Sequence, residues 1–281
     1  MEKYIEKQVE EKEFIDRLHQ KAERILSEYA ISMDDFIYEK EIIEKDKTLV
    51  NTLKAKFKKD APNEEKEAKV LADILEAIIL EESESSNWLG QNASTIKVSE
   101  YDDYVNHIDT IIEFEDAETA SHTALGIDAT YSTSIKEKFD RIKEEIKNGV
   151  LAEAKYFSSS SIKGMHIQIP RLIIGAEVKT IKELGELWLD KDSRVEGRKK
   201  EVKKALENHP AQFQILRQML LEAEVFEKYA QKVNQQKIAE TYARLKKLVQ
   251  KIYDNKNPNQ NDKGDYDNMI DIIKNNLKSF E

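Results

Sequence analysis

The chain carries two kinds of hydrophobic pattern. In its first 60 residues, apolar side chains recur near helical spacing among Glu and Lys, which predicts a helical hairpin. Pro62 and Asn63, followed by acidic residues, favour the start of another helix over 64–85. The apolar stripe expected for that helix is Leu71, Ile74, Leu75 and Ile78.

Strand-like patterns are confined to the middle of the chain. Residues 107–115 and 122–132 are rich in β-branched and apolar residues and are separated by a polar turn, which predicts an antiparallel hairpin. A helix is expected over 135–148. The nearly all-apolar run 169–177 indicates a strand buried on both faces, and a helix over 180–189 follows it.

The glycines support this division. Seven of the eight fall within residues 90–197, whereas the flanks contain almost no Gly or Pro. Residues 199–253 predict two helices with a break at His209-Pro210. We therefore expect an α/β fold with a mixed central sheet and flanking helices. Its three parts are a helical N-terminal extension (1–62), an α/β core (63–192) and a helical C-terminal region (193–281).

Composition narrows the classes of function. The chain has 281 residues, of which 45 are Lys or Arg and 55 are Asp or Glu, so its formal net charge is −10. It contains no cysteine, which excludes disulfides, thiolate metal sites and Cys nucleophiles. The charged N-terminus lacks the apolar segment of a secretory signal, and no run approaches the roughly 18 apolar residues of a membrane span. We therefore expect a cytoplasmic protein with no membrane partner.

The acidic residues are concentrated in one block. Residues 61–130 carry 3 Lys or Arg against 17 Asp or Glu. Within this block, Asp109 and Asp128 fall on the two strands of the expected hairpin, and helical phase turns Glu82 toward the core. Antiparallel pairing brings such aspartates close enough to share one divalent cation, and Mg²⁺ binds through one or two carboxylates with other oxygen ligands. This constellation predicts a Mg²⁺ or Mn²⁺ site for phosphoryl chemistry.

The order of these residues resembles the PD-(D/E)XK nuclease superfamily. The shared features are a core-facing acid on a helix, Asp109 on a strand, Asp128 on the next strand 19 residues later, and then a helix and a buried strand. The resemblance covers about residues 64–190 and implies a restriction-endonuclease-like core. It also implies that Glu82, Asp109 and Asp128 bind the metal ion, while a lysine positions or activates the water that attacks DNA.

The chain departs from the family pattern at one position. Two residues after Asp128, where the motif has Lys, the chain has Thr130. The next helix offers Lys136, Lys138 and Lys143, and helical phase places Lys138 at the border of the inner face, so we expect it to act as the catalytic lysine. The alternative is a catalytically inactive nuclease-like fold that binds nucleic acid or protein. A third interpretation is a plain helical scaffold with an acidic middle.

Other side chains extend the set of candidates. Glu81 lies at the border of the helical stripe, and Glu113 shares a strand face with Asp109. His107 and His122 flank the hairpin and suit a softer metal such as Zn²⁺ or Mn²⁺.

A basic stretch follows the expected core. Lys and Arg side chains contact nucleic-acid phosphates, although such a stretch also suits the solvated start of a helix. The candidate nucleic-acid contacts are Arg198, Lys199, Lys200, Lys203 and Lys204. The helical extensions also offer surfaces for a homo-oligomer.

Overall fold

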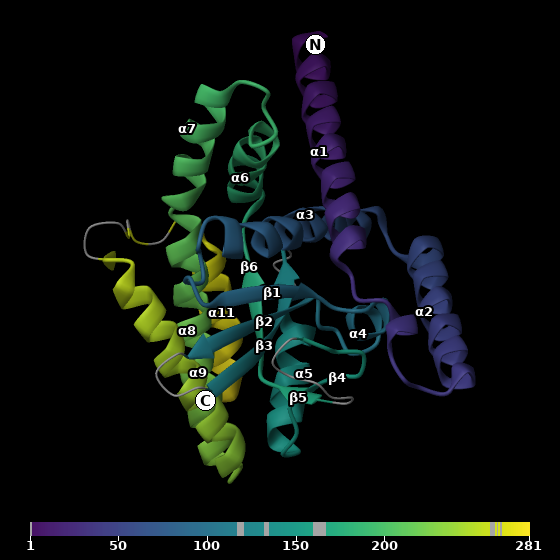
Figure 1. Cartoon of the computed structure of the whole chain (residues 1–281), viewed down its shortest axis with the longest axis vertical. Helices are drawn as coiled ribbons and strands as arrows, with labels where there is room; N and C mark the ends of the chain where they lie inside the picture. Colours follow the sequence, from purple (N-terminus) through teal and green to yellow (C-terminus); the bar gives the residue numbers. More distant parts are fainter. Residues whose placement is uncertain are drawn as a thin grey trace.

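The protein is built around a mixed four-stranded sheet (Figure 1). The computed structural model describes residues 2–116, 121–131, 135–159, 167–258, 262, 264 and 266–281, except for the side chains of 2–5, 116, 121 and 122. The sheet has the order β1-β2-β3-β6, in which β1, β2 and β3 are antiparallel and β6 is parallel to β3. Its strands are β1 (Ala93–Lys97), β2 (Thr110–Asp116), β3 (Ser121–Thr130) and β6 (Arg171–Gly175). A separate pair of strands consists of β4 (Ala152–Ala154) and β5 (Ile167–Ile169).

Helices surround the sheet and form both ends of the chain (Figure 1). The helices up to the end of the core are α1 (Glu2–Tyr29), η1 (Met33–Asp35), α2 (Lys40–Asp60), α3 (Asn63–Ser85), α4 (Glu100–Tyr104), α5 (Lys136–Lys147) and α6 (Val178–Asp190). The C-terminal helices are α7 (Glu196–Glu207), α8 (Ala211–Lys232), α9 (Gln236–Asn255), α11 (Met269–Leu277) and η2 (Lys278–Phe280). Among the described helices, none has the length and apolar character that a membrane crossing requires.

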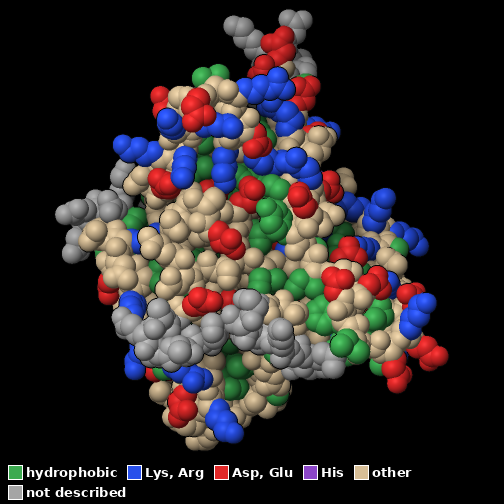
Figure 2. Space-filling model, viewed as in Figure 1, with side chains coloured by type: hydrophobic (Ala, Val, Ile, Leu, Met, Phe, Trp, Pro, Cys, Tyr) green, Lys and Arg blue, Asp and Glu red, His purple; other side chains and the backbone are tan. Residues whose placement is uncertain are grey.

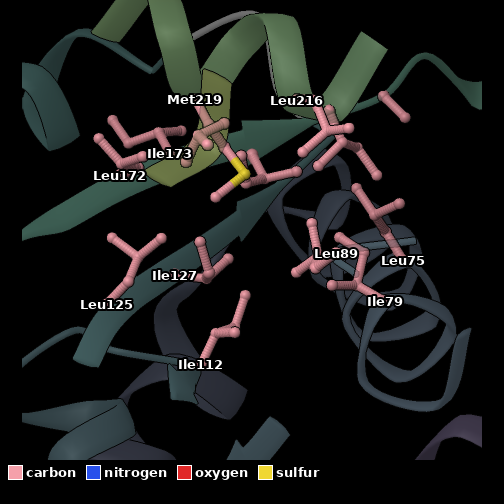
Figure 3. Packing of buried hydrophobic residues seen from close by; sticks show 14 of the residues in the cluster. Leu75, Ile79, Leu89, Ile112, Leu125, Ile127, Leu172, Ile173, Leu216 and Met219 are labelled. Atoms are coloured by element: carbon pink, nitrogen blue, oxygen red, sulfur yellow. The ribbon is translucent and has the colours of Figure 1, made fainter. Parts of the chain in front are cut away.

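The main core lies between one face of the sheet and helices α3 and α8 (Figure 3). Side chains alternate between the two faces of a strand, so every second residue of β2 and β3 points into this core. The labelled side chains include Ile112, Leu125, Ile127 and Leu172 from the sheet, Leu75 and Ile79 from α3, and Leu216 and Met219 from α8. Burying each such side chain contributes about 1.5–3 kcal/mol, which makes this core the main source of stability.

Side chains of α8 close the open edge of the sheet at β6. Gln218 accepts a hydrogen bond from the backbone N–H of Gly175 and donates one to its carbonyl, both at 2.9 Å. Glu222 accepts a hydrogen bond from the backbone N–H of Ile173 at 2.9 Å. These side chains bind alternate residues of the strand in place of another strand. The edge is therefore protected from pairing with a second chain.

The prediction that the N-terminal helices form a hairpin is wrong, because the two long helices pack on different partners. Helix α1 packs on α3 and α6, whereas α2 packs on α4. Gly185 of α6 permits the close approach of α1, since a Cβ at this position would lie 2.6 Å from Leu18 Cδ1. Ser32 caps the short η1, where its hydroxyl accepts a hydrogen bond from the N–H of Asp34.

The mixed α/β fold with flanking helices is confirmed, including the helix over 63–85, the antiparallel hairpin and the fully buried β6. The C-terminal prediction is corrected, because residues 196–255 form three helices rather than two. The additional break follows α8, where Asn234 adopts a left-handed conformation with φ of 61°. Asn tolerates this conformation better than most residues and commonly ends a helix in this way.

Candidate functional site

Asp109 and Asp128, which we call the aspartate pair, lie on adjacent chain segments of the sheet. The register pairs Thr110 with Ile127, and Asp109 also donates a backbone hydrogen bond to the Ile127 carbonyl at 2.9 Å. Two successive residues therefore face one residue of β3, which is the arrangement of a β-bulge and re-aims the side chain of Asp109. Its carboxylate accepts a hydrogen bond from the backbone N–H of Ala129 at 2.6 Å, directly after Asp128. The structure thus brings the aspartate pair together.

Lys138 is the lysine that reaches this pair. It lies in the first turn of α5, where its ammonium forms an ion pair with Asp128 and donates a hydrogen bond to the Ala129 carbonyl at 3.2 Å. Asp128 is buried, while Lys138 remains partly exposed. Thr130, at the position where the family motif has Lys, is buried at the end of β3.

The other two candidate lysines of α5 bind elsewhere. Lys136 is exposed and forms an ion pair with Asp140 on the helix surface. Lys143 donates a hydrogen bond to the carbonyl of Ser279. Each lysine differs from Lys138 by a rotation of more than 100° around the helix, which explains why only Lys138 faces Asp128.

The acid that α3 contributes to this region is Glu76. Its Oε1 lies 2.9 Å from Lys97 Nζ and accepts a hydrogen bond from the Thr110 hydroxyl at 3.2 Å. Lys97, the last residue of β1, also pairs with Asp103 at 2.7 Å and donates to the Asp109 carbonyl at 3.1 Å. Because Glu76 and Lys97 are both buried, this ammonium joins α3, α4 and the start of β2.

Glu82, the acid expected from helical phase, is engaged elsewhere, so its predicted place in the site is corrected. Its Oε1 lies 2.7 Å from Lys191 Nζ, and its Oε2 accepts a hydrogen bond from the Ser86 hydroxyl at 2.5 Å. These contacts tie the end of α3 to the end of α6. Neighbouring Glu81 accepts a hydrogen bond from the Trp188 indole. Among the described contacts, neither glutamate reaches the aspartate pair.

Four carboxylates share one buried region, which we call the acid cluster: Glu76, Asp103, Asp109 and Asp128. Burial, followed by the negative charge of Asp128, raises the pKa of Asp109 well above its usual range. Burial also raises the pKa of Glu76 to about 7, although Lys97 opposes this shift. Lys97 and Lys138 pair directly with three of the four carboxylates, and the charges of Lys69 and Arg141 also act on Asp103 and Asp128. Clustered carboxylate oxygens of this kind are ligands for a divalent cation.

The donor set of the aspartate pair fits such a cation. The pair and the Ala129 carbonyl provide two carboxylates and one carbonyl oxygen, which suffices for Mg²⁺ when water completes its coordination. The Lys138 ammonium contacts two of these groups, the Asp128 carboxylate and the Ala129 carbonyl. The Asp128 carboxylate and the Ala129 carbonyl are therefore already arranged around a positive charge. In the part of the chain that the structure describes, no group of three or more His, Asp or Glu side chains is placed to hold a metal ion by itself.

Arg171 holds the segment that leads into Asp109. Its buried guanidinium donates hydrogen bonds to the carbonyls of Asn106 and His107 at 2.8 and 2.9 Å and pairs with Glu145 of α5 at 2.5 Å. His107 adopts a left-handed conformation with φ of 56°, which is uncommon outside glycine, although His adopts it more often than most residues. Arg171 therefore fixes the turn that delivers Asp109 to the bulge.

Among the described contacts, neither His107 nor Glu113 reaches the aspartate pair. Burial and the positive charges of Arg141 and Arg171 lower the pKa of His107 to about 4, and these cations disfavour a metal ion at its ring. The side chain of His122 lies outside the described residues. Glu113 is buried and accepts a hydrogen bond from the Ser159 hydroxyl at 2.6 Å.

The predicted nucleic-acid residues form an exposed face of α7. Figure 2 shows Lys and Arg side chains gathered over the upper part of this view, where Figure 1 places α6, α7 and α1. Arg198, Lys200 and Lys203 pair with acids on or beside the same helix. In the described chain, Lys199 and Lys204 form no ion pair, which leaves two cations of this face for an external anion.

Sequence reasoning missed four residues of the site: Glu76, Lys97, Asp103 and Arg171. One signal was present, because Lys97 is the sole Lys or Arg between residues 70 and 135, within the most acidic block. A single cation in such a block is a candidate partner for buried carboxylates. The chain matches no protein-family model, and no curated protein or solved structure matches it.

Proposed function

We propose that the protein is a metal-dependent phosphodiesterase that acts on nucleic acid, with a core of the PD-(D/E)XK type. The observation that carries this proposal is the meeting of the aspartate pair with Lys138. Two carboxylates on neighbouring strands and one ammonium on the following helix are the groups that such chemistry needs. In this interpretation the lysine role has moved from the position of Thr130 to α5.

The connectivity of the core also supports the proposal. A helix (α3) precedes three antiparallel strands (β1, β2 and β3), and a helix (α5) then leads to the parallel strand β6. This order agrees with the pattern on which the family resemblance rests. Glu76 supplies the core-facing helix acid in place of Glu82.

Each group has a distinct role in the proposed reaction. Asp109, Asp128 and the Ala129 carbonyl would hold Mg²⁺ or Mn²⁺, which supplies a Lewis acid and lowers the pKa of water when bound. Lys138 orients the attacking water by hydrogen bonding and stabilises negative charge that develops on the phosphoryl oxygens. Lys97 and Glu76 position the start of β2, and with it Asp109.

The α7 face is proposed to contact the nucleic-acid backbone. Lys199 and Lys204 are exposed and form no ion pair in the described chain, so phosphates require no existing contact to break. Phosphate contacts of this kind position a nucleic acid without reading its sequence.

One observation favours a second candidate function, a catalytically inactive module that binds nucleic acid. The Lys138 ammonium already neutralises Asp128 and binds the Ala129 carbonyl, as a metal ion would. The core is then stable without a cation. A salt-sensitive affinity for nucleic acid that is indifferent to metal would support this alternative.

A cleavage assay tests the proposed activity. Supercoiled plasmid, single-stranded DNA and single-stranded RNA are incubated separately with protein and Mg²⁺ or Mn²⁺, with a chelator control. We expect cleavage of at least one substrate, and we expect Asp128→Asn to reduce its rate on the order of 10²-fold or more. Asp140→Asn, which alters an exposed acid of α5, serves as the matched control and retains the rate. Equal rates in Asp128→Asn and wild type would overturn the proposal.

A further inference from the structure

A large cavity lies between the N-terminal helices and the core, and Lys97 is among the residues that line it. Its volume is about 950 Å³, and its lining comes from α1, α2, α3 and α4 with the adjoining loops. This volume falls within the range of small-ligand sites. Figure 1 shows α2 to one side of the sheet, with α4 between them.

Six lysines and five acidic side chains line the cavity, although the chain as a whole has a marked acidic excess. Three of the lysines pair with lining acids, and a fourth, Lys47, pairs with Asp34 at 2.7 Å. Lys69 pairs with Asp73 at 2.9 Å, Lys97 pairs with two members of the acid cluster, and Lys54 pairs with Glu100.

Two of the lining lysines have no such partner. Lys58 near the end of α2 and Lys66 in the first turns of α3 form no ion pair in the described chain. They face the same cavity from two helices. Because an anion at either ammonium would break no existing ion pair, these two lysines are the lining groups best suited to phosphate.

The rest of the lining includes an apolar wall. Its members are Leu26, Ile31, Met33, Phe57, Val70 and Val98. The Tyr104 ring also lines the cavity, with the ammonium groups of Lys54 and Lys69 at 5.3 and 5.6 Å from its centroid. Apolar and aromatic side chains, together with unpaired lysines, suit a ligand with a planar apolar part and a phosphate.

We propose that this cavity binds a nucleotide unit, with its phosphate at Lys58 and Lys66 and its base against the apolar wall. A free nucleotide and one nucleotide of a single strand both present this combination of a phosphate and a base. The floor of the cavity is formed by Glu76, Lys97 and Asp103, and Lys97 also binds the carbonyl of Asp109. The occupant would therefore lie beside the acid cluster. The inference does not rest on the proposed activity, since binding is measurable without cleavage.

Calorimetric titrations in a chelating buffer at low salt test this inference. The probes are ATP, a 5′-phosphorylated oligothymidylate and inorganic pyrophosphate. The test variant is Lys58→Ala/Lys66→Ala. The control is Lys237→Ala/Lys247→Ala, which removes two exposed lysines of α9 that form no ion pair in the described chain. Thermal unfolding of each variant verifies that it is folded.

We expect ATP, the oligonucleotide or both to bind wild type more tightly than pyrophosphate does. We also expect these probes to bind the Lys58→Ala/Lys66→Ala variant more weakly than wild type or control. Binding of ATP alone identifies a free nucleotide as the occupant, and binding of the oligonucleotide alone identifies a strand; either supports the inference. For the strand, the slope of log affinity against log salt should fall by about 0.7 in the test variant, because the variant loses one phosphate contact. The inference would be overturned by absence of binding, by equally tight binding of pyrophosphate, or by equal losses of affinity in the test and control variants. These outcomes are independent of any loss of cleavage.

Discussion

The carboxylate of Asp109 accepts a hydrogen bond from the backbone N–H of Ala129 at 2.6 Å, across the junction between the segment before β2 and the end of β3. This bond fixes the half-buried Asp109 beside the buried Asp128, in spite of the electrostatic cost of placing two carboxylates together. The Lys138 ammonium, which pairs with Asp128, offsets part of this cost. We propose that a divalent cation offsets the rest.

Lys138 and Lys136 provide a matched comparison on one helix. We predict that Lys138→Ala lowers the cleavage rate on the order of 10²-fold, because the variant loses the one ammonium that contacts Asp128. Lys136→Ala should stay within about twofold, because its exposed pair with Asp140 contributes little. Single-turnover rates of both variants on the same substrate provide the measurement. Equal losses would show that general charge, and not the position of Lys138, determines the rate.

Lys97 is predicted to be essential to stability. Lys97→Met leaves the buried Glu76 and the half-buried Asp103 without their shared cation and should lower the free energy of unfolding by about 3–5 kcal/mol. Lys54→Met breaks the more exposed pair with Glu100 and should cost about 0–1 kcal/mol. Urea denaturation at neutral pH distinguishes the two variants. A small loss for Lys97→Met would mean that water, rather than Lys97, stabilises these acids.

Much of the fold could be predicted from the sequence because its elements carry strong local patterns. The stripe of α3, the hairpin of β2 and β3, and the all-apolar β6 each bury a face that its residue order displays. The packing of α1 and α2 could not be predicted, since their amphipathic patterns show that a face is buried but not which partner covers it. Likewise, the break at Asn234 depends on one residue in a left-handed conformation, which a periodic pattern does not reveal.

The candidate site was predictable only in part. The aspartate pair followed from the hairpin, because antiparallel strands place the two residues at one end. The acid that α3 contributes to the site could not be predicted, because α3 is covered on more than one side. Both Glu76 and Glu82 are buried, so helical phase could not choose between them. The choice depends on tertiary contacts with Thr110 and Lys97.

Glu222 should make stability depend on pH. Burial raises its pKa in the folded protein well above the ordinary value of 4.5, and its Oε1 has no hydrogen-bond partner among the described residues. Because folding raises this pKa, the contribution of Glu222 to the free energy of unfolding is fully present below pH 4.5. It is lost as pH rises toward the folded-state pKa, by about 1.4 kcal/mol per pH unit. Glu222→Gln should remove this loss, so that the variant becomes more stable than wild type at high pH.

Denaturation of Glu222→Gln across a series of pH values tests this prediction. The control is Glu224→Gln on the same helix, where Lys228 lowers the pKa of an exposed carboxyl. A lowered pKa has the opposite sign, so this control should lose a small amount of stability above pH 4.5 and gain none. Parallel pH profiles for wild type and Glu222→Gln would show that Glu222 does not titrate differently on folding.

The central claim is that the aspartate pair binds a divalent cation, and a calorimetric titration with Mn²⁺ tests it most directly. The proteins to compare are wild type, Asp109→Asn/Asp128→Asn and the control Asp140→Asn. Asn at position 109 retains an oxygen for the Ala129 N–H, so the double variant is expected to stay folded. We predict saturable binding to wild type and control and its loss in the double variant. No binding to wild type, or equal binding to the double variant, would contradict the claim.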